Sequence, residues 1–329
     1  MQTVRCSRHA LPAEHRDIGV GGWAYAPPMS TTADIAAQVP APSKSLSPSR
    51  ASDFMTCPLL YRFRTIDRLP EAPSSAAVRG TVVHQVLEDL FDLPPQQRTL
   101  EQAVLMLPAA WDRVRETDSR AAELFDTPSG EDVAAEVSSW LATAEPLLTT
   151  YFTLENPAQL EPAQRELRVE TTLDDGLVLR GFVDRLDVNP AGDTRVVDYK
   201  TGRSPTPGFE SKALFQMRFY ALVLWRSTGQ LPRLLQLLYL GNGEILRYEP
   251  DEADLRATER KIVAIWGAIE RARDSGDWRP SPSKLCDWCD HKALCPAFGG
   301  IAPPLPTGTV TLEIEPVAGS KVLEPEPLG

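Results

Sequence analysis

Three consecutive strand patterns constrain the fold of this chain more than any other feature. Apolar and polar residues alternate from 166 to 173, as in a half-buried strand. An Asp-Asp-Gly turn at 174–176 leads into a second pattern at 177–188, and a short polar loop separates this from a third at 194–200. Strands joined by such short connections pair with each other, so we expect an antiparallel arrangement here.

Two acids and a lysine lie within the second and third strand patterns. Asp198 follows Asp184 by fourteen residues, close enough for a hairpin to bring the two together. Side chains alternate along a strand, so Asp198 and Lys200 point one way while Val197 and Tyr199 point the other. Two carboxylates can hold a divalent metal ion, and an ammonium can steady a water molecule or a developing negative charge. That combination suits metal-assisted phosphodiester hydrolysis, although Asp-x-Lys also occurs in surface ion pairs of little consequence.

A helix is predicted upstream, because apolar residues recur at helical spacing between 82 and 91. Thr81 is the expected N-cap, since its hydroxyl can accept a hydrogen bond from a backbone N–H of the first turn. His84 then lies near the helix start, where a neutral imidazole could ligate a metal ion. Taken alone, a histidine in this position is more often an ordinary residue at the edge of a helix.

A second helix is predicted over 209–228, where Gln216 and Tyr220 are four residues apart and share one face. Together the segments form an ordered set: Gly-x3-His, Gly-x2-Asp-Arg-x-Asp, Asp-Tyr-Lys-Thr-Gly and Gln-x3-Tyr. Over about residues 45–300 this set resembles the RecB-type nuclease family of the PD-(D/E)XK superfamily, the group that also includes the CRISPR-adaptation exonucleases.

The resemblance implies roles for the matching residues. Lys200 matches the lysine that orients the attacking water or stabilises the phosphate, and the helix motif supports that lysine and contacts the DNA strand. The expected metal ligands are His84, Asp184, Asp198 and the backbone carbonyl of Tyr199. The expected helix-motif residues are Gln216 and Tyr220. The expected ions are Mg²⁺ or Mn²⁺.

Three further acids are less clearly assigned. Glu166 or Glu170 occupies the strand where the family often has another acid, but the match is loose. Asp187 faces opposite Asp184 in a regular strand, so it fits a supporting role better than a ligand role.

The cysteines form a second signature. The chain has five, and three of them form Cys-x2-Cys-x5-Cys. With one far upstream, four thiolates can hold a 4Fe–4S cluster or a zinc ion, and spacing alone does not choose between them. The resemblance favours the iron–sulfur subgroup, where one cysteine precedes the nuclease core, three follow it, and the cluster joins the two ends. The four expected cluster ligands are Cys57, Cys286, Cys289 and Cys295, while Cys6 and His291 stay unassigned.

Net charge bears on a DNA partner, because phosphate binding requires Lys and Arg. The chain carries −11 overall, but the excess acid is concentrated in 82–150, at −9. The segments 44–79 and 201–249 are each +3 and flank the motifs. The candidate phosphate contacts are Arg50, Arg62, Arg64, Arg203 and Arg218.

The element order predicts an α/β fold of the restriction-endonuclease type. We expect a mixed sheet flanked by helices, with a helical insertion between His84 and the first strand, in a nuclease domain over 44–300. Residues 1–43 and 301–329 are expected to be disordered. No apolar stretch approaches the ~20 residues needed to span a bilayer, and no secretory signal is evident, so a cytoplasmic location is expected.

These features predict a metal-dependent DNA exonuclease that acts on single strands or DNA ends in repair or recombination. A non-catalytic DNA-binding subunit of a helicase–nuclease complex and a CRISPR spacer-processing nuclease are the alternatives. A zinc-stabilised protein of unrelated activity is also compatible with the cysteines. No Gly-x4-Gly-Lys-[Ser/Thr] motif occurs, so any helicase or ATPase motor would act from a separate chain.

Overall fold

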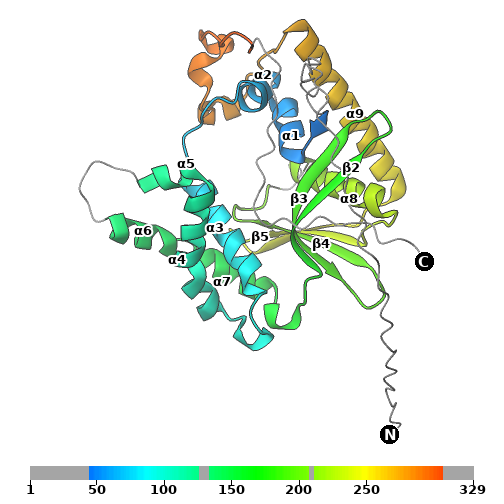
Figure 1. Cartoon of the computed structure of the whole chain (residues 1–329). Coiled ribbons are helices and arrows are strands. Elements are labelled where there is room, and N and C mark those ends of the chain that lie inside the picture. The colour runs from blue at the N-terminus through cyan, green and yellow to red at the C-terminus, as the bar shows by residue number, and fades with distance from the viewer. Residues whose placement is uncertain (1–43, 126–132, 207–210, 307–329) are drawn as a thin grey trace, which may run out of the picture. The chain divides into compact units, whose positions relative to one another are not determined.

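The structure is a computed structural model that describes residues 44–125, 133–206 and 211–306. The expected N-terminal extension and the tail beyond residue 306 lie outside these residues, as does Cys6. The mixed sheet flanked by helices is confirmed (Figure 1). Among the described residues, no helix combines the length and apolar character that crossing a membrane requires.

The sheet is organised around its longest strand, β3 (Val178–Val188). β2 pairs with it antiparallel along most of its length. Along its other edge, β3 pairs with two different strands, one at each end. A short parallel strand, β1, pairs at Val178 and Leu179, and β4 pairs antiparallel from Arg185 to Val188. β5 joins β4 in parallel, and β6 closes the order antiparallel. The remaining strands are β1 (Ser45–Leu46), β2 (Gln164–Thr172), β4 (Thr194–Lys200), β5 (Leu234–Tyr239) and β6 (Glu244–Tyr248).

The strands predicted at 166–173, 177–188, 194–200, 233–240 and 244–249 all form within one or two residues of these ends, but β1 was not predicted. It has only two residues, too few to show alternation, and its partner lies more than 130 residues away in the chain. A contact of that kind is fixed by tertiary packing rather than by local preference.

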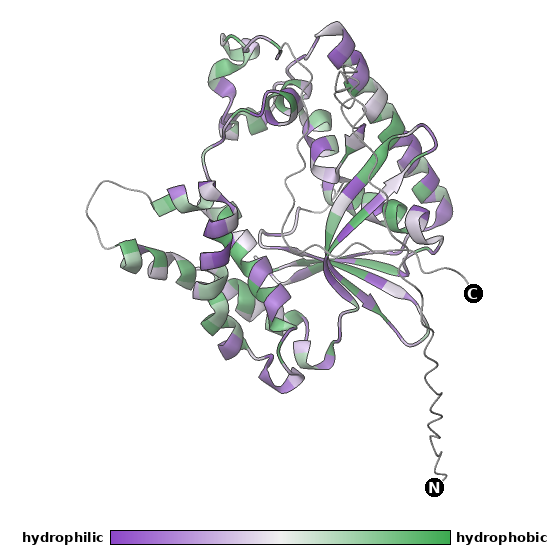
Figure 2. Cartoon of the chain, viewed as in Figure 1, coloured by the Kyte–Doolittle hydropathy of each residue, from purple (hydrophilic) through white to green (hydrophobic). Residues whose placement is uncertain are grey.

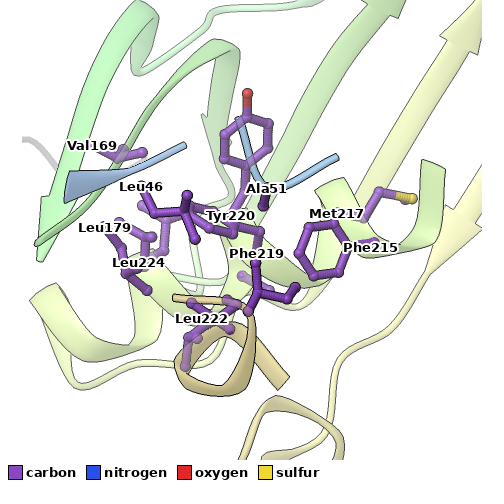
Figure 3. Close-up of a cluster of buried hydrophobic side chains, with 14 of the residues drawn as sticks. Leu46, Ala51, Val169, Leu179, Phe215, Met217, Phe219, Tyr220, Leu222 and Leu224 are labelled. Atoms are coloured by element: carbon purple, nitrogen blue, oxygen red, sulfur yellow. The ribbon is translucent and has the colours of Figure 1, made fainter. Parts of the chain in front are cut away.

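One face of the sheet is covered by α8 (Ser211–Thr228) and α9 (Glu252–Ser275). α8 is the crossover that a parallel pair such as β4 and β5 requires. Asp251 caps α9 by accepting the Asp254 N–H at 2.8 Å, and Gly276 ends that helix with a φ of 71°. Figure 3 shows the core beneath α8, where the hydroxyl of Tyr220 points out of the apolar cluster.

The helical insertion covers the other face of the sheet. Val197 and Tyr199 of β4 are buried in a second core with residues of the insertion, while Val196 belongs to the first core. β4 is therefore buried on both faces at its two valines, and the strands of the sheet carry both hydrophobic and hydrophilic residues in Figure 2. The insertion helices are α3 (Ser75–Leu90), α4 (Leu100–Thr117), α5 (Ser119–Ala122), α6 (Val133–Ala142) and α7 (Glu145–Leu154).

The predicted start of the His84 helix is wrong. Thr81 is not its N-cap, because α3 begins at Ser75 and the Ser74 side chain accepts the Ala77 N–H at 3.3 Å. His84 therefore lies in the third turn of a longer helix. The extra turns form because the apolar face extends back to Val78, which is buried.

The segment after β1 is helical and is interrupted at Pro58. α1 (Pro48–Thr56) and α2 (Pro58–Tyr61) are followed by one π-helical turn at Arg62–Ile66. Residues just beyond the expected domain boundary at 300 also pack, since Leu305 contacts the first core. The 3-10 turns are Pro95–Gln97, Glu123–Phe125, Pro157–Gln159, Lys284–Trp288, Lys292–Leu294 and Pro296–Phe298.

A buried ionic network joins the insertion to the sheet. Arg185 of β3 is fully buried. It forms ion pairs with Glu155, the C-cap of α7, at 2.8 Å and with Asp187 at 3.1 Å, and it donates to the Tyr199 hydroxyl at 2.8 Å. Arg195 of β4 pairs with the same two acids at 3.3 and 2.7 Å. Asp187 thus supports the two strands from the face opposite Asp184.

Replacing Arg185 with Met should lower the free energy of unfolding by about 3–5 kcal/mol, because the buried acids lose their central cation. Urea denaturation would measure this. The matched control is Arg115→Met, which removes an exposed pair with Asp112 on α4 and should change stability by less than about 0.5 kcal/mol. Equal effects of the two substitutions would contradict the importance of the network.

Candidate active site

The two motif aspartates meet where β3 and β4 separate. The last residues paired between these strands are Arg185 and Val197, so the next positions out, Asp184 and Asp198, face each other. Beyond this point the Asp184 carboxylate accepts the Tyr199 N–H, with Oδ2 at 2.7 Å. The Asp184 side chain thus takes the place of a backbone acceptor from β3. This hydrogen bond fixes its Oδ2 atom where β3 and β4 separate.

A group of three side chains is suited to hold a metal ion. His84 of α3, Glu166 of β2 and Asp184 of β3 each offer a ligand atom within 4.8 Å of the others, and no other such group occurs in the described parts of the chain. The His84 Nδ1 atom lies 3.5 Å from Asp184 Oδ2. Glu166 lies opposite Asp184 in the β2–β3 register and has a φ of 44°. That left-handed conformation is strained for a residue with a side chain.

The loose sequence match at Glu166 is therefore the one that joins the site. Glu170, the other candidate, is exposed and pairs with Arg168 at 2.7 Å. Strand alternation alone could not separate them, because both point to the same face of β2. What distinguishes them is their register against β3, which places Glu170 opposite Arg180 instead of Asp184.

The carboxylates of the site repel one another. Burial raises the pKa of Glu166 to about 8, with further contributions from the charges of Asp184 and Glu88. Burial also raises the pKa of Asp184 to about 6, and the Asp198 charge adds to this while His84 opposes it. Partly buried acids held this close are unfavourable until a cation offsets them, so the electrostatics favour a bound positive ion.

Asp198 is held by a lysine and a glutamine. Lys200 Nζ lies 2.6 Å from Asp198 Oδ2, and Gln216 Nε2 donates to Oδ1 at 3.1 Å. The same Gln216 nitrogen is 3.4 Å from the Tyr220 hydroxyl. The expected Gln-x3-Tyr motif thus reaches the site through Asp198. Asp198 is outside the three-residue group, so its role as a metal ligand stays a prediction.

Tyr199 can contribute only its backbone to this side of the sheet. Its ring is buried on the opposite face, and its hydroxyl accepts from Arg185 at 2.8 Å. Its N–H is already used by Asp184. The expected ligand role of the Tyr199 carbonyl stays a prediction.

Two motif glycines are explained by close approaches behind the site. A Cβ on Gly181 would lie 2.6 Å from Cε1 of Tyr220, and a Cβ on Gly80 would lie 2.9 Å from the Thr201 hydroxyl oxygen. Neither approach leaves room for a side chain. The absence of a Cβ lets α8 and α3 come close enough to β3 and the end of β4 for their polar side chains to converge.

The five candidate DNA-contact arginines differ in their environment. Arg62 is 6% exposed, pairs with Asp67 at 2.9 Å and donates to the Pro303 carbonyl, so it stabilises the fold. Arg64 and Arg218 are each paired with carboxylates. Arg203 is exposed, and Arg50 is partly exposed. These last two are the better placed of the five to meet a phosphate.

The four signature cysteines lie around one pocket. It brings Cys57, at the start of α2, together with the three cysteines that follow α9. The Ser281 N–H donates to the Cys57 sulfur at 3.4 Å, and the Ser283 N–H donates to that of Cys286 at 3.3 Å. His291, unassigned from the sequence, is buried and lies 3.0 Å from a Glu71 carboxylate oxygen.

Glu166→Gln should stabilise the metal-free protein at high pH. In the unfolded chain the glutamate ionises near its ordinary pKa of 4.5, but in the folded protein it holds its proton to about pH 8. The wild type therefore loses stability as pH rises through this interval, and the glutamine variant does not. Thermal unfolding in EDTA should show no difference near pH 4.5 and the largest difference above pH 8.

The matched control is Glu170→Gln on the same strand, which should show no such pH-dependent gain. In excess Mn²⁺ the wild type should be more stable than Glu166→Gln, because glutamine is a poorer metal ligand than glutamate. A metal role for Glu166 would be contradicted if the stability difference between Glu166→Gln and wild type were the same with and without Mn²⁺.

Comparison with known proteins agrees with the site. The family model of the PD-(D/E)XK nuclease superfamily matches residues 45–296. The gene 69 protein of Mycobacterium phage D29 is 26% identical over 282 residues, covering 79% of this chain and 99% of that protein. The gene 69 protein of Mycobacterium phage L5 is 32% identical over 127 residues, 38% of this chain and 41% of its own length.

Among solved structures, a candidate exonuclease from Eubacterium rectale has a similar fold, with a TM-score of 0.50 and 16% sequence identity. The alignment covers 80% of this chain and 93% of the other. The fold, the converging acids and the family match over most of the chain lead to one conclusion: this chain belongs to the PD-(D/E)XK nuclease superfamily.

Proposed function

We propose that this nuclease is a divalent-metal-dependent DNA exonuclease that acts on single strands or DNA ends. The observation that carries the proposal is the convergence of His84, Glu166 and Asp184 beside the ion pair of Asp198 and Lys200. The solved structure of a candidate exonuclease with this fold is consistent with it.

The donor set fits the expected ions. Two carboxylates suit Mg²⁺ or Mn²⁺, and an imidazole is accepted more readily by Mn²⁺. The raised pKa values of Glu166 and Asp184 indicate that the site has excess negative charge for a cation to offset. His84, Glu166 and Asp184 would hold the ion, with Asp198 as a further candidate. When bound, such an ion supplies Lewis-acid stabilisation of phosphate charge and lowers the pKa of water.

Lys200 is the residue that we expect to act on the reacting phosphate. Its side chain is 31% exposed, while its ammonium is kept in place by Asp198. Gln216 holds the other Asp198 oxygen, so α8 fixes the direction of the lysine indirectly. A positioned cation that meets charge developing on a phosphate oxygen stabilises the transition state more than the ground state.

Lys200→Ala should reduce cleavage by at least about 100-fold, as expected for the loss of one preorganised donor, while leaving DNA affinity within about twofold. The assay follows 5′- and 3′-labelled single- and double-stranded DNA with Mg²⁺, Mn²⁺ or EDTA. Lys212→Ala, on the exposed start of α8, is the matched control and should cut at the wild-type rate. Cleavage by Lys200→Ala at a comparable rate would remove this role.

The same assay separates the alternatives. A folded wild-type protein that binds DNA but cuts none of it with either metal would favour the non-catalytic subunit of a helicase–nuclease complex. DNA repair or recombination is the setting that we propose for an active enzyme, with CRISPR spacer processing as the narrower alternative. Any helicase or ATPase partner would be a separate chain.

We also propose that the four signature cysteines hold a 4Fe–4S cluster. The four cysteines line one pocket, and four thiolates brought together in this way can hold a 4Fe–4S cluster or a zinc ion. The resemblance to the iron–sulfur subgroup favours the cluster, with Cys57, Cys286, Cys289 and Cys295 as its ligands. The cluster would join α2 to the segment after α9.

Cys289→Ser should abolish the cluster. Anaerobically purified wild type should be brown and contain about four iron atoms per chain, whereas the variant should be nearly colourless and less stable to heat. Cys6→Ser is the matched control, because Cys6 is outside the pattern, and should keep the full iron content. A colourless wild type with about one zinc per chain would replace the cluster with a zinc site.

A further inference from the structure

β3 has a stretch with an open edge beside the acids. β1 pairs with β3 only as far as Leu179, and the pairing with β4 begins at Arg185. Between these points lies Phe182, an aromatic residue that is 40% exposed. Phe182 is two residues from Asp184 along the strand, so their Cα atoms are about 6–7 Å apart.

Three arginines lie near Phe182. Arg168 of β2 lies directly opposite it, with 32% of its side chain exposed. Two residues further from the acids, Arg180 is partly exposed, and Arg50 of α1 is close by. Burial lowers the pKa of Arg50, and the Arg180 charge lowers it further. Neither Arg50 nor Arg180 has a carboxylate within ion-pair distance among the described residues, so two like charges face the same region.

An exposed ring and arginines in line with catalytic acids suit one kind of occupant. Every nucleobase has a flat face that stacks on an aromatic side chain, and arginines bind the phosphates that follow. A base is free to stack in this way only when it is unpaired. The net charge of −11 also disfavours binding that depends on phosphate contacts alone.

We propose that Phe182 is a stacking platform for an unpaired base next to the scissile phosphate, with Arg180 and Arg50 binding the backbone further along the same DNA strand. This inference rests on the proposed nuclease function and adds its substrate class, single-stranded DNA. It also predicts the path of the strand, which leaves the acids along β3 in the direction of β1.

The test measures binding of fluorescein-labelled oligodeoxythymidylate by the full-length Lys200→Ala protein in Mg²⁺, with and without Phe182→Ala. Loss of one base–aromatic stack should weaken binding about 5- to 100-fold, and Phe182→Trp should restore it. The matched control is Val188→Ala, which removes another exposed apolar side chain from β3 on the far side of Asp184 and should leave affinity unchanged. A fully paired duplex should lose less than twofold with Phe182→Ala.

A second readout reports stacking directly. 2-Aminopurine at each of the last few positions of the oligonucleotide should be quenched at one position by the Phe182 protein and not by Phe182→Ala. Affinity within twofold of the parent for Phe182→Ala, or equal losses for duplex and single strand, would overturn the platform. Wild type that cuts DNA normally while Phe182→Ala keeps its affinity would reject this inference alone. A wild type that neither cuts nor binds DNA would reject the proposed function as well.

Discussion

The buried charge of Arg185 is the constraint on which the arrangement of this nuclease depends. An arginine without water must be surrounded by acceptors, and this one is met by acids and phenols from β3, β4 and the end of α7. The network therefore determines how the helical insertion packs on the sheet. Since α3 of that insertion carries His84 and β3 carries Asp184, it also sets the distance between two of the candidate metal ligands.

The acids of the candidate active site lack the charge partners that Arg185 has. Arg185 has more acceptors than it needs, whereas Glu166 and Asp184 have too few positive partners and hold protons at unusually high pH. Repulsion between the clustered acids thus destabilises the fold on one face, and the hydrogen-bonded network of Arg185 on the other face offsets this cost. This contrast is typical of sites where strain is retained for function.

Much of this could be predicted from the sequence, because the strands and long helices follow clear periodicities and the motif residues are ordered along the chain. The convergence of His84 with Asp184, and of Gln216 with Asp198, agrees with those motifs. Three features could not be predicted. β1 is too short to show a pattern, the start of α3 depends on the burial of Val78 in the second core, and the choice of Glu166 over Glu170 depends on register. All three are set by tertiary contacts rather than by neighbouring residues.

The two ends of the described chain depend on each other even without a cluster. Arg62 donates to the carbonyl of Pro303, 241 residues later, and Tyr61 stacks on Trp278 with 6.0 Å between ring centroids. During synthesis the ribosome releases α1 and α2 long before these partners exist. The first core can therefore close only when almost the whole nuclease has been translated. An unfinished chain would lack a complete site, so cutting activity would arise late in synthesis, at one step, and not gradually as the chain emerges.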